Sequence, residues 1–256
     1  MRTIIIKDQE HFQFELFDKI DSVKHIVTGK NPHIKRGLID GLNYGLHVPD
    51  NAEVVQKNRK EIINHFGLES AKVVVPKQTH SSTIEIVTSS NYNTPFDDVD
   101  ALITNEKNIV IGILSADCVP ILLLDPVERV IACIHAGWRG TVAEIAKKTV
   151  LKMCQQFGSK PQNILAGIGP SISQKNYEVG EDVSKYFSTD CLVDSHNNKK
   201  CVDLWKENKN QLVFIGLVES NIEIAGMCTY EEKEKFYSAR RDTINTGRLG
   251  SFISIT

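Results

Sequence analysis

The sequence predicts a mixed α/β or α+β fold, and three observations support this. Short apolar runs at 109–114, 121–124 and 130–134 indicate buried strands. Other segments repeat apolar residues at helical spacing, which predicts helices. Helical and strand segments alternate without a repeat or a Pro/Gly-rich linker, so we expect residues 1–256 to form a single domain. Periodicity does not choose between a Rossmann-like sheet and a sandwich of two sheets.

The composition is that of an ordinary globular protein. Of 256 residues, 41% are hydrophobic and 24% are charged, which excludes wholesale disorder. A net charge of -2 gives no electrostatic reason to expect nucleic acid or a membrane surface as partner, and no protein partner is evident. Charged residues interrupt the N-terminal apolar run before the core of a signal peptide could form, so we expect a cytoplasmic location. Six scattered cysteines without a Cys-x-x-Cys pair argue against a disulfide framework or a zinc ribbon.

The first predicted elements are a helix and two strands, with a histidine in the loop between the strands. Asp50 followed by Glu53 predicts the start of a helix that carries Arg59 and ends at Gly67. The β-branched segments 72–75 and 83–87 read as strands, and His80 lies in the loop between them. A polar loop, 89–99, then leads into the apolar segment 100–103.

The middle of the chain contains the interior of the predicted fold. The runs 121–124 and 130–134 are joined by a short turn, so we expect them to be neighbouring strands. Thr141 and Glu144 match a Thr-x-x-Glu capping box, which predicts a helix beginning just after Gly140. Later segments are expected to form a strand at 164–168, a helix at 204–217 and a strand at 222–227.

Residues of types that commonly bind metals lie near the ends of two of these strands. Cys118 and His135 lie near the ends of buried strands, where their side chains can meet, and His80 can reach them from its loop. Imidazole and thiolate suit Zn(II) or Cu(I), and three ligands leave one position open, as in catalytic zinc sites. The residues alone leave other interpretations open, because a buried Cys is more often a core residue. A Cys118–His135 nucleophile–base pair is a further alternative.

Other polar residues near the predicted strand ends suit acid–base chemistry or anion binding. Asp100 and Asp117 suit general bases, groups that orient a metal-bound histidine, or simple caps of strand ends. The Gly-Trp-Arg-Gly turn containing Arg139 favours binding of an anion, since it precedes a helix, or it is a glycine turn with a packed Trp and a solvent-facing Arg. Arginines that lie close together near the C-terminus suit phosphate or carboxylate, or form a solvated basic patch: Arg240, Arg241 and Arg248. The two common nucleotide fingerprints are absent from the sequence.

Several motifs together resemble the laccase-domain family, also named the polyphenol oxidase YfiH/YlmD family. The resemblance runs in order over roughly residues 38–250. The matching segments are Gly-Leu-Asn-Tyr-Gly-Leu-His-Val at 41–48, Lys-Asn-Arg at 57–59, Gln-Thr-His at 78–80, Asp-Val-Asp-Ala-Leu-Ile-Thr at 98–104, Ala-Asp-Cys-Val-Pro-Ile at 116–121, Ile-His-Ala-Gly-Trp-Arg-Gly-Thr at 134–141, Gly-Ile-Gly-Pro at 167–170, Tyr-Glu-Val-Gly at 177–180, Cys-Thr-Tyr at 228–230, Phe-Tyr-Ser-Ala-Arg-Arg-Asp at 236–242 and Thr-Gly-Arg at 246–248.

The resemblance implies a layered α/β/β/α sandwich with mixed sheets and a zinc ion held by His80, Cys118 and His135. It also implies a purine nucleoside phosphorylase acting on adenosine, inosine, guanosine and methylthioadenosine, with adenosine deamination as a second activity. A copper polyphenol oxidase is the rival from the same family. We expect the catalytic residues to be Asp117, Cys118 and His80. The residues expected to contact substrate or phosphate are Asn43, Arg59, Arg139, Arg241 and Arg248.

The chain departs from the family pattern in two places. The segment 28–37 replaces a glycine-rich stretch that is usual before the Leu-Asn motif, which puts the base or ribose preference in doubt. Lys175 and Asn176 stand where paired cysteines often precede the Tyr-Glu-Val-Gly motif, so this chain does without that pair.

Overall fold

The computed structural model describes residues 1–68, 71–196 and 199–256. Within these ranges the strands form two six-stranded sheets and a smaller three-stranded one. The first sheet contains both the N-terminal and the C-terminal strands. Its order is β1 (Arg2–Ile6), β2 (Gln9–Gln13), β3 (Val23–Thr28), β15 (Leu249–Ile255), β7 (Ile109–Ser115) and β4 (Lys72–Val74). Pairing is antiparallel except between β4 and β7.

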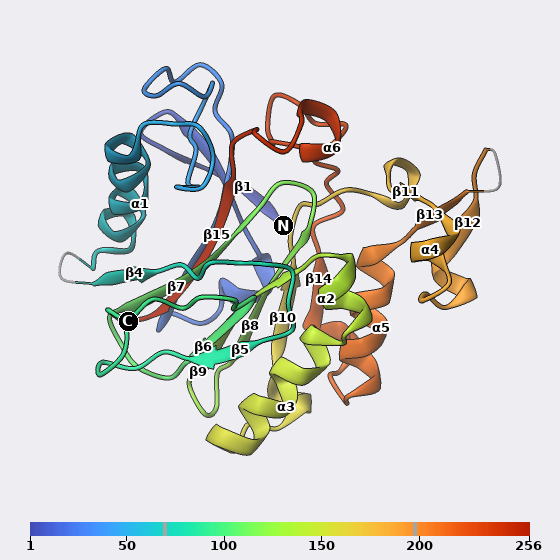
Figure 1. Cartoon of the computed structure of the whole chain (residues 1–256). Helices are drawn as coiled ribbons and strands as arrows, with labels where there is room; N and C mark the ends of the chain where they lie inside the picture. Colours follow the sequence, from blue (N-terminus) through green and yellow to red (C-terminus); the bar gives the residue numbers. More distant parts are fainter. Residues whose placement is uncertain (69–70, 197–198) are drawn as a thin grey trace.

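The second sheet is built mainly from the middle of the chain. Its order is β14 (Ile222–Ile224), β10 (Leu165–Ile168), β8 (Val119–Asp125), β9 (Val130–Ala136), β6 (Ala101–Thr104) and β5 (Ile84–Ile86). Both edge strands, β14 and β5, pair in parallel with their neighbours, so the sheet is mixed. The small sheet, β11 (Glu178–Val179), β13 (Lys200–Val202) and β12 (Leu192–Asp194), extends from the side of the molecule beyond α5 (Figure 1).

Helices cover the outer faces of the two large sheets. The α-helices of the described residues are α1 (Ala52–Phe66), α2 (Trp138–Val142), α3 (Ile145–Phe157), α4 (Glu181–Ser184), α5 (Leu204–Phe214) and α6 (Ala239–Asp242). Helix α1 packs on the first sheet, whereas α3 and α5 pack on the second (Figure 1). None of these helices is long and apolar enough to cross a membrane, in the ranges that the structure describes.

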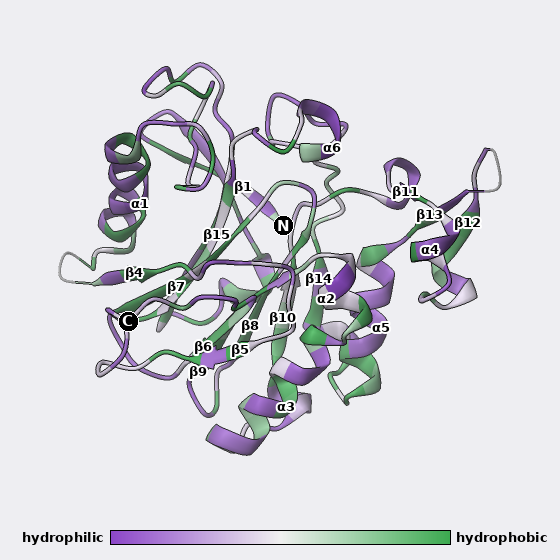
Figure 2. Ribbon diagram, viewed as in Figure 1, coloured by the Kyte–Doolittle hydropathy of each residue, from purple (hydrophilic) through white to green (hydrophobic). Residues whose placement is uncertain are grey.

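Alternation along the strands produces three apolar layers. In β7, Ile111 and Ile113 face the second sheet, whereas Val110 and Leu114 face α1. In β9, Ile131 and Cys133 pack between the sheets, and the intervening residues pack under α3 and α5. Strands buried on both faces read as continuous apolar runs, which explains the pattern in the sequence and the hydrophobic strands of Figure 2.

The predicted mixed α/β fold is confirmed, and the helices and sheets form α/β/β/α layers. Helix α1 forms as expected, but its cap is Asn51 rather than Asp50, because the Asn51 side chain accepts hydrogen bonds from the Glu53 and Val54 amides. The strand predicted at 222–227 ends at Ile224, and the helix predicted at 204–217 ends at Phe214.

The predicted capping box at Thr141 and Glu144 is wrong. Helix α2 already begins at Trp138, so Thr141 lies inside it, and Glu144 has a left-handed backbone (φ 58°) between α2 and α3. Trp138 and Arg139 therefore open a helix of five residues instead of preceding a longer one. The N-terminal strands and β15 have no counterpart in the sequence prediction.

Candidate metal and substrate site

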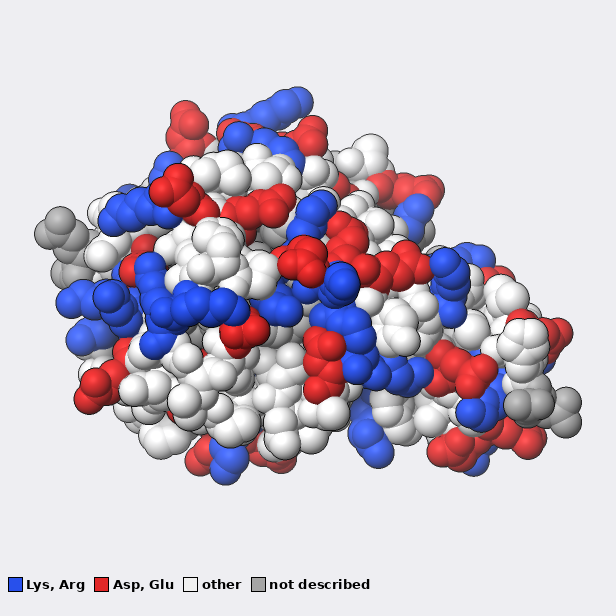
Figure 3. Space-filling view, turned by 90° about the horizontal axis from the view of Figure 1, so that it is seen from above, with Lys and Arg blue, Asp and Glu red and all other residues white. Residues whose placement is uncertain are grey.

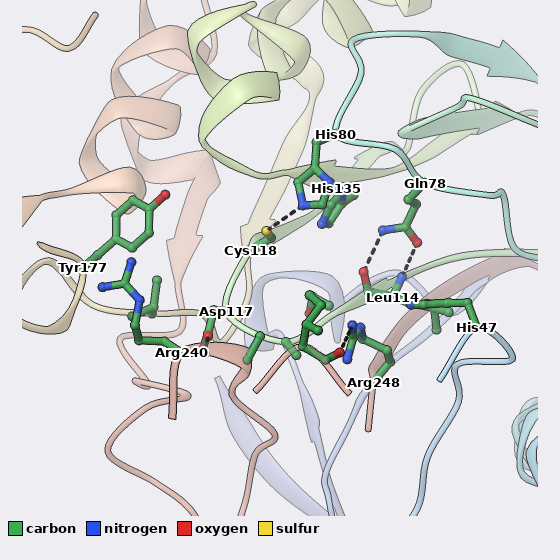
Figure 4. Close-up of a pocket in the computed structure, with 15 residues that line it drawn as sticks. His47, Gln78, His80, Leu114, Asp117, Cys118, His135, Tyr177, Arg240 and Arg248 are labelled. Atoms are coloured by element: carbon green, nitrogen blue, oxygen red, sulfur yellow. Dashed lines mark hydrogen bonds between the residues drawn. The ribbon is translucent and has the colours of Figure 1, made fainter. Parts of the chain in front are cut away.

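One cavity of about 450 Å³ lies at the edge where β7 ends and β8 begins. It collects residues from six separate segments of the sequence, and Figure 4 shows their side chains around a common space. The lining residues are His47, Gln78, His80, Leu114, Ser115, Ala116, Asp117, Cys118, His135, Ile172, Tyr177, Ala239, Arg240, Ile244 and Arg248.

His135 occupies the penultimate position of β9, opposite Pro120 of β8. Its side chain is buried, and its Nδ1 lies 2.7 Å from Oδ1 of Asp100. Because a carboxylate only accepts, Nδ1 carries the hydrogen and donates it to Asp100. The other ring nitrogen, Nε2, is therefore the acceptor atom that is available to a metal.

Asp100 also holds the loop that carries His80. Its carboxylate accepts hydrogen bonds from the backbone amides of Thr79, His80 and Ser81, and from the Ser81 hydroxyl. These bonds support a left-handed backbone at His80 (φ 63°), which is costly for a residue other than glycine. One buried carboxylate thus orients His135 and fixes the position of His80.

Gln78 attaches the same loop to the first sheet. Its amide donates to the Leu114 carbonyl and accepts from the Leu114 amide, both at 2.7 Å. The side chain imitates a strand at the edge of β7, where both backbone groups of Leu114 find partners. The loop of His80 is therefore held by both large sheets.

Cys118 completes the group from the turn between β7 and β8. Its Sγ lies 3.6 Å from Nε2 of His80, and the two histidine rings meet edge to face with centroids 4.9 Å apart. The nitrogen and sulfur ligand atoms of His80, Cys118 and His135 all lie within 4.8 Å of one another. A Cβ atom on Gly137 would be 2.7 Å from Cδ2 of His80 and 3.1 Å from the sulfur, so only glycine leaves this space open.

The electrostatics of the three residues favour a thiolate. Burial would raise the pKa of Cys118, but His135 and His80 outweigh this effect and lower it below its usual range. Burial would lower the pKa of His135, yet the Cys118 charge and the hydrogen bond to Asp100 raise it. A thiolate beside two imidazoles matches the donor set of zinc and of copper(I) sites. The 3.6 Å between Sγ of Cys118 and Nε2 of His80 also suits two donors that each lie about 2.0–2.3 Å from one ion.

The predicted catalytic residue Asp117 lines the cavity next to Cys118. It is buried, with a left-handed backbone (φ 93°), and both its carboxylate oxygens already accept hydrogen bonds. Oδ1 accepts from the Thr229 hydroxyl and Oδ2 from the Arg240 amide, each at 2.7 Å.

Only one of the arginines expected to contact substrate lines the cavity. Arg248 is 8% exposed, and its guanidinium donates to the carbonyls of Ile244, Thr246 and Gly247. Arg240 lines the cavity as well, although we did not include it among the expected contacts. Ion pairs join Arg2, Arg36 and Arg241 to carboxylates, and no such pair involves Arg240 or Arg248 among the described residues.

The other expected contacts lie outside the lining of the cavity. The buried amide of Asn43 bonds to Gly45, Asp50 and the Arg248 amide, and Arg59 donates to the Tyr44 carbonyl. These two residues therefore support the loop that carries His47. Arg139 is exposed and stacks on Trp138, with its Cζ 4.4 Å from the ring centroid. Arg241 donates to backbone carbonyls and pairs with Asp242.

The sequence prediction missed His47, Gln78 and Tyr177 as lining residues, and it named Arg240 only as one of three clustered arginines suited to phosphate or carboxylate. Each lies in a segment that the family resemblance covers, so the motifs pointed to the right loops but not to the side chains that face the cavity. The face seen from above in Figure 3 carries basic and acidic side chains interspersed, in keeping with the near-neutral net charge.

Known proteins resemble this chain over nearly its whole length. The family model described as "Multi-copper polyphenol oxidoreductase laccase" matches residues 24–256. A purine nucleoside phosphorylase of Bacteroides thetaiotaomicron is 34% identical, with 98% of both chains covered. The adenosine deaminase RL5 of an unknown prokaryotic organism is 35% identical and covers 90% of this chain and 95% of its own.

The fold has solved counterparts too. The crystal structure of Bacillus licheniformis hypothetical protein YfiH superposes with a TM-score of 0.88 at 30% identity, covering 96% of each chain. Sequence and structure therefore agree on the family. The chain belongs to the laccase-domain family that includes YfiH and the purine nucleoside phosphorylases similar to it.

Proposed function

We propose that this protein is a zinc-containing purine nucleoside phosphorylase that also deaminates adenosine. The observation that carries the proposal is that one cavity contains a His–Cys–His group and a buried arginine, Arg248, which forms no ion pair with the described carboxylates. Relatives named purine nucleoside phosphorylase and adenosine deaminase support a nucleoside-processing enzyme. Adenosine, inosine, guanosine and methylthioadenosine are the proposed nucleosides, with phosphate as the second substrate.

In phosphorolysis, a phosphate oxygen forms a bond to the anomeric carbon of the ribose while the bond from that carbon to the base nitrogen breaks. The leaving base keeps the bonding electrons and takes up the proton released by hydrogen phosphate. We assign Arg248 to the phosphate, because its three hydrogen bonds to carbonyls leave guanidinium N–H groups free and its charge lacks a carboxylate partner among the described residues. Positioning and charge stabilisation are the contributions expected of such a residue.

His80, Cys118 and His135 would hold the metal, with Asp100 orienting His135. Zinc in this group would supply a Lewis acid that polarises a substrate oxygen or a water. The protein's own contribution is to keep the thiolate charged, to present Nε2 of His135 and to fix His80 through Asp100. The same cavity then serves deamination of adenosine without a second pocket.

The test is an assay of purified protein of measured metal content on inosine and on adenosine, with and without phosphate. The proposal predicts ribose 1-phosphate and free base only when phosphate is present, and inosine from adenosine in either case. Absence of ribose 1-phosphate and free base under every condition would sink the phosphorylase assignment.

A second candidate function is a cysteine hydrolase, which the lowered pKa of Cys118 beside His135 favours. Measuring the metal content of the purified protein distinguishes the zinc enzyme from the cysteine hydrolase. Stoichiometric zinc that is lost in Cys118→Ala supports coordination, whereas a metal-free protein that a thiol alkylator inactivates supports a nucleophile. Copper bound in place of zinc, together with oxygen-dependent phenol turnover, would favour the oxidase that the family description names.

A further inference from the structure

Arg240 lies over the ring of Tyr177, and the two side chains form a charged, aromatic surface at one end of the cavity. The Cζ atom of Arg240 lies 5.3 Å from the centroid of the Tyr177 ring, and both side chains line the cavity (Figure 4). Nη1 of Arg240 also donates to the Glu178 carbonyl, which keeps the guanidinium beside the ring. A guanidinium stacked on an aromatic ring is a surface on which planar heterocycles stack well.

Asp117 connects this surface to the His–Cys–His group. Its Oδ2 accepts from the backbone amide of Arg240, and its Oδ1 accepts from Thr229 on the same segment. Cys118 is the next residue in the chain. Because both oxygens of Asp117 are directed at the segment 229–240, this carboxylate is placed to fix Arg240 relative to Cys118 rather than to carry a proton.

Further contacts hold the segments of Tyr177 and Arg240 together and order the loop that carries Arg240. Glu231 accepts hydrogen bonds from Lys175 and Asn176, which precede Tyr177. The Arg241 guanidinium donates to the carbonyls of Thr229, Tyr230 and Phe236, so it braces the loop from which Arg240 projects. Adjacent arginines thus have different tasks, since Arg241 binds its own backbone and Arg240 faces the cavity.

We infer that the Tyr177–Arg240 surface binds the purine base and that Asp117 is the positioning residue that holds Arg240 there. The inference rests on the proposed function, whose substrates are nucleosides. It assigns base and phosphate to different arginines, because the exposed Arg240 lies over an aromatic ring whereas Arg248 is buried among carbonyls. Figure 4 shows the two arginines apart, with Asp117 between them and the His–Cys–His group above both.

The experiment measures binding of hypoxanthine and of inorganic phosphate by calorimetry, and the KM of each substrate, on metal-loaded protein. We expect Tyr177→Leu and Arg240→Ala to weaken hypoxanthine binding and to raise the KM for inosine by about tenfold each, as for loss of a base-stacking side chain. Phosphate binding and the phosphate KM should stay within about twofold of wild type. Tyr186→Leu is the matched control. Tyr186 likewise has a cation, the Lys185 ammonium, over its ring, but it lies outside the cavity lining.

Asp117→Asn tests the positioning role. It should raise the inosine KM like Arg240→Ala and leave the pH profile of kcat unchanged, and the double variant should be no worse than Arg240→Ala alone. A large loss of kcat with an unchanged KM and a lost limb of the pH profile would instead make Asp117 a proton carrier and overturn this role. If Asp117→Asn fails to fold, Arg240→Ala and Tyr177→Leu still decide the base site, because neither side chain is fully buried.

The outcomes separate this inference from the proposed function. Unchanged hypoxanthine binding in Tyr177→Leu and Arg240→Ala, with phosphorolysis intact in wild type, overturns the base site and leaves the function standing. Hypoxanthine binding that both variants weaken, without turnover in wild type, supports the base site and removes the phosphorylase assignment. Wild-type protein that neither binds hypoxanthine nor turns over nucleosides overturns both.

Discussion

Buried histidines occur in both large sheets, and their surroundings shift their pKa values in opposite directions. His11 and His25, in β2 and β3 of the first sheet, have a pKa lowered to about 4, mainly by burial. His135, in β9 of the second sheet, is buried to a similar degree, yet its pKa is raised by the Cys118 charge and the bond to Asp100. Burial alone therefore does not predict the direction of a histidine pKa shift. The charged or hydrogen-bonding partner of the ring determines it.

The hydrogen bonds explain the difference in function. His25 accepts from the Phe14 amide at 2.8 Å, and His11 accepts from the Gly29 amide, so both remain neutral acceptors that satisfy backbone groups. His135 faces a thiol and a carboxylate instead. The first pair belongs to the packing of the sheet, whereas the second sheet presents its histidine to the cavity. Each of the following predictions changes one side of this comparison.

The largest effect is expected for Cys118→Ala, which removes the charge that distinguishes His135 from His25. The metal content should fall from about one ion per chain to near zero, since two imidazoles no longer provide a complete site. Nucleoside turnover should be lost with it. Elemental analysis and the phosphorolysis assay check the result, with Cys201→Ala as the control because Cys201 lies outside the cavity. A fully loaded Cys118→Ala protein would contradict the assignment of the ligands.

The second prediction concerns acid stability and the first sheet. Because the folded pKa values of His11 and His25 lie near 4, below the ordinary value of 6.5, the unfolded chain binds protons first as the pH falls. Stability should decrease between about pH 6.5 and 4, by up to ~3 kcal/mol for each histidine, and the effect should saturate below pH 4.

Urea unfolding at several pH values measures this dependence. His25→Gln should flatten the curve by about one proton. Equal slopes in wild type and His25→Gln would show that His25 does not titrate as its burial implies.

The smallest effect is expected for Asp100→Asn, which weakens the partner that orients His135. Metal affinity should fall by about 10–100-fold, the usual range for the loss of a carboxylate behind a metal-bound histidine. A competition assay with a metal chelator measures it. Unchanged affinity would mean that the remaining contacts of His80 and His135 suffice without Asp100.

The sequence predicted those parts of the fold and site whose signals are local or strong. Strands β7, β8 and β9 are buried on both faces, so their apolar runs identify them, and the family motifs carry His80, Cys118 and His135. Strand β15 was missed because it is a C-terminal segment inserted between β3 and β7, whose positions in the chain are distant. No local pattern specifies such pairing.

The sequence also could not show which of the adjacent arginines faces the cavity. Arg240 and Arg241 are adjacent and chemically identical, and their different directions depend on carbonyls of residues 229, 230 and 236 and on the distant Asp117. The capping box failed for a related reason, since Glu144 adopts a left-handed backbone between two helices that pack under the second sheet. Tertiary contacts decided both cases.

The most direct test of the account is a crystal structure with anomalous scattering measured on both sides of the zinc and copper absorption edges. We predict a single peak that appears at the zinc edge, with His80, Cys118 and His135 as its protein ligands at about 2.0–2.3 Å. A peak at the copper edge would contradict zinc as the metal. A protein that turns over nucleosides while no metal scatters from this site would contradict the central claim itself.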